Sequence, residues 1–128
     1  MARSKSTNKP TEAELSLLNV LWSIGPATVR EIHDAVSSTQ KTGYTTVLKI
    51  LQIMHEKALV IRDESNRAHV YAPANSQTHT QSSLLQDLVS KAFGGSTSNL
   101  VMRAIDESTS QQEIDDIRQL LNKIEQEK

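Results

Sequence analysis

One stretch of the chain, from Gly43 to Lys57, carries the side chains best suited to recognition chemistry. At about 3.6 residues per turn its apolar residues fall on one helical face, which consists of Val47, Ile50, Leu51 and Met54. The other face is polar and consists of Thr45, Thr46, Lys49, Gln52 and Glu56. Hydroxyl, ammonium and amide groups can enter a groove of DNA and bond to base edges or phosphates. Many surface helices carry such residues for solvation only, so this stretch alone leaves that alternative open.

Two capping boxes predict two helices in front of this stretch. Thr11 and Thr28 each stand three residues before a glutamate, a spacing that satisfies free backbone N–H groups at a helix start. Gly25, followed by a proline, ends the first helix. The apolar residues that face inward are Leu15, Leu18, Val20, Leu21, Trp22 and Ile24 in the first helix and Val29, Ile32, Ala35 and Val36 in the second.

The hydrophobic period changes after residue 57, where two β-prone runs, 59–62 and 68–71, predict a hairpin. A polar turn separates them, in which Asn66 can take a positive φ, and Pro73 closes the second run. Three helices followed by a hairpin is the order of a winged helix-turn-helix. In that fold the third helix enters the major groove of DNA and the hairpin lies along the backbone.

Three further helices are predicted after residue 76. The first ends at Gly94, a shorter one follows Ser96, and a third capping box, from Ser110 to Glu113, opens the last. Such short helices have more apolar surface than they can cover among themselves, which favours a symmetric homodimer. The alternative is that they fold back onto the first domain. The candidate dimerisation residues are Leu84, Leu85, Leu88, Val89, Phe93, Leu100, Val101, Ile105, Ile114, Ile117, Leu120, Leu121 and Ile124.

The fold class expected from these elements is mainly α with a small β-hairpin. Residues 1–9 form a basic arm expected to be flexible, residues 10–75 a winged helix-turn-helix domain, and residues 76–128 a helical dimerisation region. Through residue 75 there are nine Lys and Arg against seven Asp and Glu, and from residue 76 there are five against eight. This mild asymmetry is consistent with a first domain that faces an anion.

Several classes of function find no support in the chain. The absence of cysteine excludes disulfides and thiolate metal sites, and no apolar run approaches the roughly 18 residues of a membrane span. The N-terminus lacks the apolar core of a signal peptide, so we expect a cytoplasmic protein without membrane insertion. The four histidines lack metal-site spacing, and no nucleophile–base pair or phosphate loop stands out. We therefore expect no enzyme, no cofactor and no metal.

Several stretches of the chain, taken together, resemble the penicillinase-repressor (methicillin-resistance repressor) family of bacterial winged-helix regulators. The matching stretches are 11–14, 20–22, 27–32, 43–49 and 67–71, followed by 93–95 and 100–101 in the C-terminal part. The resemblance implies a homodimeric repressor whose winged-helix domain binds operator DNA and whose C-terminal helices form the dimer.

Carried over by position, Thr45, Thr46 and Lys49 match family positions that contact DNA from the recognition helix. The same three residues also lie opposite the apolar face. Arg67 in the hairpin turn would reach the backbone or the minor groove, and Arg30 on the second helix would contact a phosphate. The remaining candidates for DNA contact are Tyr44, Gln52, Lys41 and Thr42.

The chain departs from the family pattern at several positions. In the best-known members a membrane-bound sensor metalloprotease cuts an Asn-Phe bond, which makes such a protease a candidate partner. The aligned positions here are Arg103 and Ala104, so this cleavage is not carried over. A copper-responsive branch uses cysteines, which this chain lacks. Ala58 and Asn66 stand where glycines often end the recognition helix and turn the wing.

Two functions of different classes follow from these patterns. The first is a sequence-specific transcriptional repressor, located on the nucleoid, that binds a palindromic operator in double-stranded DNA as a homodimer. The alternative is a winged-helix protein-interaction module without DNA readout, which the near-zero net charge favours slightly. Convergence of Lys49, Arg67 and Arg30 on one face would favour the repressor, and their dispersal would favour the interaction module.

Overall fold

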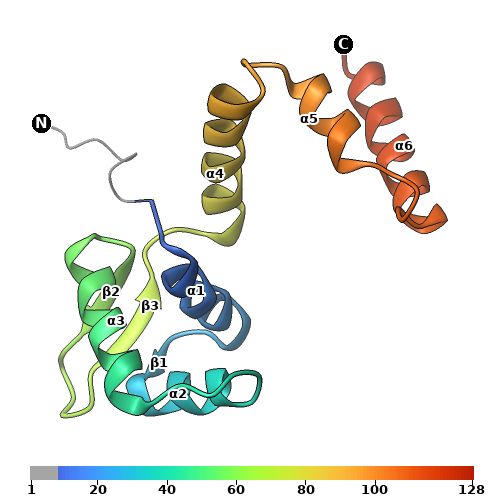
Figure 1. Ribbon diagram of the computed structural model, residues 1–128. Coiled ribbons are helices and arrows are strands. Elements are labelled where there is room, and N and C mark those ends of the chain that lie inside the picture. The colour runs from blue at the N-terminus through green and yellow to red at the C-terminus, as the bar shows by residue number, and fades with distance from the viewer. Residues whose placement is uncertain (1–8) are drawn as a thin grey trace, which may run out of the picture. The chain divides into compact units, whose positions relative to one another are not determined.

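The computed structural model describes residues 9–128, and residues 1–8, which hold most of the predicted basic arm, lie outside the described residues. The elements are α1 (Glu12–Ile24), β1 (Ala27–Thr28), α2 (Val29–Ser37), α3 (Tyr44–Glu56), β2 (Val60–Asp63), β3 (Val70–Pro73), α4 (Gln77–Ala92), α5 (Thr97–Ala104) and α6 (Gln111–Gln126) (Figure 1). The predicted fold class, mainly α with a small sheet, is confirmed. The chain divides into two compact units, unit 1 through Leu84 and unit 2 from Leu85 onward.

The three predicted capping boxes are all present, and they determine where α1, α2 and α6 begin. In α1 the Glu14 backbone N–H donates to Thr11 Oγ1 at 3.2 Å, and the Thr11 N–H donates back to Glu14 Oε1 at 2.9 Å. The same reciprocal pair starts α2 at Thr28 and α6 at Ser110. Gly25 ends α1 with φ +87°, a left-handed conformation that glycine adopts without steric cost.

The predicted hairpin is part of a larger sheet. β2 and β3 pair antiparallel, and β1 adds to the other edge of β3, so the strand order is β1-β3-β2. The two residues of β1 pair with Tyr71 and Val70, across more than forty residues of chain. A strand of two residues is too short to show a hydrophobic period, which is why the sequence pattern did not predict it.

The prediction of a positive φ at Asn66 is wrong. Among the residues that the structure describes, Ala58 is the only non-glycine residue with positive φ, at +63°. Ala58 follows α3, where its N–H donates to the His55 carbonyl at 3.1 Å, and the left-handed residue reverses the chain into β2. The wing turn closes differently, because the Asp63 carboxylate accepts a hydrogen bond from the Ser65 N–H at 2.9 Å.

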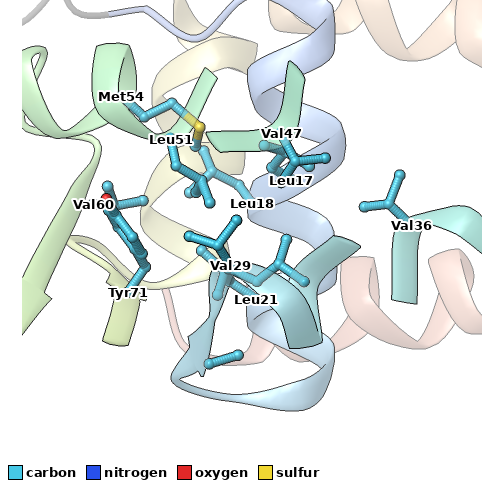
Figure 2. Packing of buried hydrophobic residues seen from close by; sticks show 12 residues of the cluster. Leu17, Leu18, Leu21, Val29, Val36, Val47, Leu51, Met54, Val60 and Tyr71 are labelled. Carbon is cyan, nitrogen blue, oxygen red and sulfur yellow. The ribbon is translucent and has the colours of Figure 1, made fainter. Parts of the chain in front are cut away.

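The core of unit 1 is built by all three helices and the sheet (Figure 2). Its buried residues are Leu17, Leu18, Leu21, Ala27, Val29, Ile32, Val36, Val47, Leu51, Met54, Val60 and Tyr71. Figure 2 shows the α3 side chains Val47 and Leu51 near Leu17 and Leu18 of α1, with the sheet residues Val60 and Tyr71 next to each other in the same cluster. Burial of a leucine or valine side chain contributes about 1.5–3 kcal/mol, so this cluster holds α3 in place on unit 1.

Two polar contacts in unit 1 join residues that are far apart in the sequence. Glu14 is 4% exposed, and its carboxylate accepts a hydrogen bond from Lys57 Nζ at 2.6 Å, which ties the start of α1 to the end of α3. Burial alone would raise the pKa of Glu14, but hydrogen bonds from Lys57 and Thr11 outweigh it and hold the pKa below its ordinary value. Trp22 Nε1 donates to the Asn75 carbonyl at 3.0 Å, which holds the segment after β3.

The predicted helices α4, α5 and α6 are present, but none contributes a buried residue. Ser96 caps α5, since its hydroxyl accepts from the Asn99 N–H at 3.1 Å. The most exposed apolar side chains of unit 2 include Met102 at 69% and Leu121 at 58%. In the described part of the chain, no helix is long and apolar enough to cross a membrane.

Candidate nucleic-acid interface

The two faces of α3 differ as the sequence predicted. Val47, Leu51 and Met54 are 0% exposed, while the candidate contact residues Thr45, Thr46, Lys49 and Gln52 are all exposed. The burial fixes the rotation of α3 about its own axis, because turning it would bring polar groups into the core. The polar face is therefore held outward by the packing on the opposite side.

The N-terminus of α3 lacks a side-chain cap. Gly43 occupies the N-cap position and no side chain accepts a hydrogen bond from the first turn. The other five helices of the described chain each have a hydroxyl residue in this role, including Ser76 at the start of α4, whose Oγ accepts from the His79 N–H at 3.1 Å. First-turn N–H groups without a side-chain acceptor can bind a phosphate oxygen.

Three of the predicted contact residues gather at this end of α3. The Arg30 guanidinium carbon lies 5.8 Å from the centroid of the Tyr44 ring, within the range of a cation–π contact. Tyr44 is the first residue of α3 and is 43% exposed. The carbonyl of Thr42 lies 2.8 Å from His33 Nε2, so the residues before α3 are held against α2.

His33 also lies at this end of α3, where sequence reasoning did not place it. Its ring lies edge-on to Tyr44, with the ring centroids 6.0 Å apart. Sequence spacing gave no signal for this contact, because it depends on the path of the loop between α2 and α3. The loop also carries Lys41, which is exposed.

The wing, which is the loop between β2 and β3, carries a further cation. β2 runs back along α3 after the chain reversal at Ala58, and Figure 1 shows the β2–β3 loop extending toward the edge where α3 begins. Arg67 lies exposed in this loop. Arg62 at the base of the wing is instead engaged by Glu64, with Nε donating to Oε2 at 2.6 Å. Arg67 is therefore the wing arginine that an anionic partner can reach.

The arrangement supplies donors and cations but no metal centre. Between residues 9 and 128 no group of three or more His, Asp or Glu side chains could hold a metal ion. Hydroxyls, one amide, cations and open backbone N–H groups on one helix and its surroundings are suited to bind an anionic polymer.

Three helices, a small antiparallel sheet with a wing and an outward polar face on the third helix define a winged helix-turn-helix protein. Residues 10–123 match the family model described as penicillinase repressor, and the chain belongs to this family, whose members are transcriptional repressors and not enzymes. The family suggested by the residue motifs is thereby confirmed.

Individual relatives agree with this assignment. The chain is 30% identical over 115 residues to the transcriptional regulator BlaI of Mycobacterium tuberculosis (strain ATCC 25618 / H37Rv), covering 89% of this chain and 83% of the relative. It is 21% identical over 118 residues to the methicillin resistance regulatory protein MecI of Staphylococcus aureus (strain N315), covering 91% of this chain and 96% of the relative. Both matches extend over the winged helix and most of the C-terminal helices.

Proposed function

We propose that this chain is a homodimeric, sequence-specific repressor that binds a palindromic operator in double-stranded DNA. The observation that carries the proposal is α3, whose polar residues are exposed while Val47, Leu51 and Met54 on the opposite face are fully buried and Ile50 is half-buried. α3 lies in the major groove. There Thr45 and Thr46 bond to phosphates or bases or pack on thymine methyl groups, and Lys49 favours guanine. Gln52 extends the same face by one turn.

Phosphate contacts surround the recognition helix and set its register on the duplex. Arg30 with Tyr44, and the uncapped N–H groups at the start of α3, bind one backbone segment. Lys41 and Thr42 contribute from the loop before α3. Arg67 reaches the backbone or the minor groove from the wing, which makes binding depend steeply on salt.

The homodimer forms through unit 2. Twelve of the thirteen candidate dimerisation residues lie in unit 2, and Leu84 directly precedes it. All thirteen are exposed or half-buried, including Leu85 at 49% and Leu88 at 48%. A twofold axis brings the same face of each subunit together and buries these side chains. The two copies of α3 then read half-sites whose centres are about one helical turn, or a multiple, apart.

Repression follows where the operator overlaps a promoter, because the bound dimer blocks RNA polymerase. The protein acts in the cytoplasm, on the nucleoid. The first test is selection of fragmented genomic DNA by the purified protein at near-physiological salt, followed by sequencing. An enriched twofold-symmetric motif upstream of a gene is the expected result. Recovery of DNA without any shared motif would contradict the operator and favour the protein-interaction module.

A matched pair of lysine variants tests the assignment of α3. Lys49→Ala removes a cation from the proposed groove face, and Lys123→Ala removes one from an exposed position on α6. We expect Lys49→Ala to weaken operator binding about tenfold and to relax selectivity at one base position per half-site. Lys123→Ala should leave both unchanged. An unaltered site preference in Lys49→Ala would remove Lys49 from the set of reading residues.

A further inference from the structure

His33 on α2 contacts both Thr42, which precedes the recognition helix α3, and Tyr44, whose ring forms a cation–π contact with Arg30. His33 Nε2 lies 2.8 Å from the Thr42 carbonyl oxygen and 3.2 Å from Ser37 Oγ. The other ring nitrogen, Nδ1, lies 3.4 Å from the Asp34 carboxylate. The side chain is 25% exposed, so it is largely enclosed by these neighbours.

The chemistry of these partners decides which ring nitrogen carries a proton. A backbone carbonyl only accepts hydrogen bonds, so Nε2 is protonated and donates to Thr42. This hydrogen bond spans the loop between α2 and α3. Earlier in the loop, the N–H groups of Thr39 and Gln40 both donate to the Val36 carbonyl at 3.0 Å. His33 holds the later part, immediately before α3 begins.

The same ring also restrains the first residue of α3. Its edge-on contact with Tyr44, at 6.0 Å between centroids, limits the positions that the Tyr44 ring can adopt. Arg30 rests over Tyr44, at 5.8 Å from the ring centroid. Arg30 and His33 lie three residues apart and therefore on neighbouring positions of the α2 surface. The imidazole thus supports the ring on which the arginine rests.

We propose that His33 is a positioning residue for DNA binding, which holds Thr42 and Tyr44 so that Arg30 and the open N-terminus of α3 face one phosphate together. The proposal rests on the proposed function. His33 acts through its neighbours and need not touch DNA. Without it the loop end and the Tyr44 ring gain freedom, and part of the binding free energy is lost in ordering them again.

Two substitutions separate the hydrogen bond from side-chain size and helix propensity. Glutamine and methionine are similar in length and both are good helix formers. His33→Gln keeps a terminal N–H donor that can reach the Thr42 carbonyl, whereas His33→Met has none. Urea unfolding followed by Trp22 fluorescence reports whether either variant changes the stability of unit 1.

The measurement is binding to a fluorescent mixed-sequence duplex and to the selected operator, over a salt series from about 50 to 200 mM. We expect His33→Met to bind both duplexes about tenfold more weakly, with a salt slope smaller by about one. His33→Gln should recover the part of the loss that comes from the hydrogen bond to Thr42, but not the part that comes from the ring contact with Tyr44. Arg30→Ala should show a similar loss of slope. In the Arg30→Ala background, His33→Met should then add little, because the two act on one phosphate contact.

The outcomes distinguish the two levels of the proposal. Wild-type protein that binds neither duplex would overturn the proposed function and the role of His33 with it. Wild-type protein that binds, together with a folded His33→Met variant whose affinity and salt slope are unchanged, would overturn the role of His33 alone. Full additivity of His33→Met and Arg30→Ala would also overturn it, because it would show that His33 does not act through Arg30.

Discussion

Units 1 and 2 differ in the burial of their apolar residues. In unit 1 the apolar faces of α1, α2 and α3 meet one another and the sheet, and Ile32, Val47 and Leu51 are 0% exposed. In unit 2, α5 and α6 also begin with side-chain N-caps, but they contribute no buried residue. Local helix signals therefore do not distinguish a domain that completes its own core from one that does not. The difference predicts that unit 1 folds by itself whereas unit 2 needs a second copy.

The largest effect is expected from a charge on the apolar face of α6, which tests whether unit 2 needs a second copy. Leu121→Glu puts a carboxylate where the proposed dimer buries a leucine, and an unpaired buried charge costs several kcal/mol. We expect the dissociation constant of the dimer to rise at least a thousandfold, or about 4 kcal/mol. Sedimentation velocity over a range of protein concentrations measures it.

Gln119→Glu is the control, because it adds the same charge on the opposite face of the same helix. It should leave the dissociation constant nearly unchanged. A Leu121→Glu variant that self-associates like the wild type would show that this face is not the dimer interface.

The core of unit 1 should give the second largest effect. Leu51→Ala leaves a cavity at a site with 0% exposure and should lower the free energy of unfolding of unit 1 by about 3 kcal/mol. Ile61→Ala, at a β2 position that is 60% exposed, should cost far less. Urea unfolding monitored by Trp22 fluorescence compares the two. Equal losses would contradict the difference in burial on which the comparison of units rests.

The ion pair between the buried Glu14 and the half-buried Lys57 gives a smaller effect with a defined pH dependence. The folded-state pKa of Glu14 lies below its ordinary value of 4.5, so its contribution to stability is complete above the unfolded-state pKa and is lost as the pH falls through the folded-state pKa. At neutral pH, Glu14→Gln should lower the free energy of unfolding by about 2 kcal/mol. The gap between variant and wild type should close in acid.

Glu12→Gln serves as the control for the ion pair, since Glu12 lies in the same first turn but is exposed. Unfolding curves of both variants over a pH series provide the measurement. A loss in Glu14→Gln that stays constant down to acidic pH would mean that the hydrogen-bonded carboxylate is not its source.

The smallest effect concerns the uncapped start of α3. Gly43 has φ −78° and a Cβ there would meet nothing within 4 Å, so serine fits without strain. Gly43→Ser should stabilise unit 1 by about 0.3 kcal/mol through the new cap and yet weaken DNA binding, because its hydroxyl occupies N–H groups that a phosphate would use. Gly43→Ala lacks the acceptor and should not stabilise the helix. Thermal unfolding and duplex titration report the two effects, and tighter binding by Gly43→Ser would contradict the phosphate contact.

Much of this architecture could be predicted from short-range patterns. The capping boxes at Thr11, Thr28 and Ser110 each start a helix, since their hydrogen bonds join residues only three positions apart. The helical spacing of the apolar residues in α3 likewise predicted, without any knowledge of the fold, that Thr45 and Lys49 face outward. Assignment of these residues to DNA contact still rests on the proposal.

Other features could not be predicted, because they join residues distant along the chain. β1 exists only through its pairing with β3, and Glu14 is buried only because Lys57 arrives at the end of α3 to neutralise it. The left-handed residue after α3 is Ala58, which stands where relatives often have glycine; alanine rarely adopts positive φ, so its residue type alone did not predict this conformation. The contact of His33 with Thr42 and Tyr44 depends on where the intervening loop returns the chain.

By itself, the sequence determined the order of the helices and of the β2–β3 hairpin, the outward face of α3 and the family, because each depends on residue patterns within a few turns of chain. Only the tertiary structure decided that Lys57 pairs with the buried Glu14, that β1 pairs with β3, and where Arg30 meets Tyr44. These contacts join segments that are distant along the chain. They form because they bury apolar side chains and give buried polar groups hydrogen-bond partners.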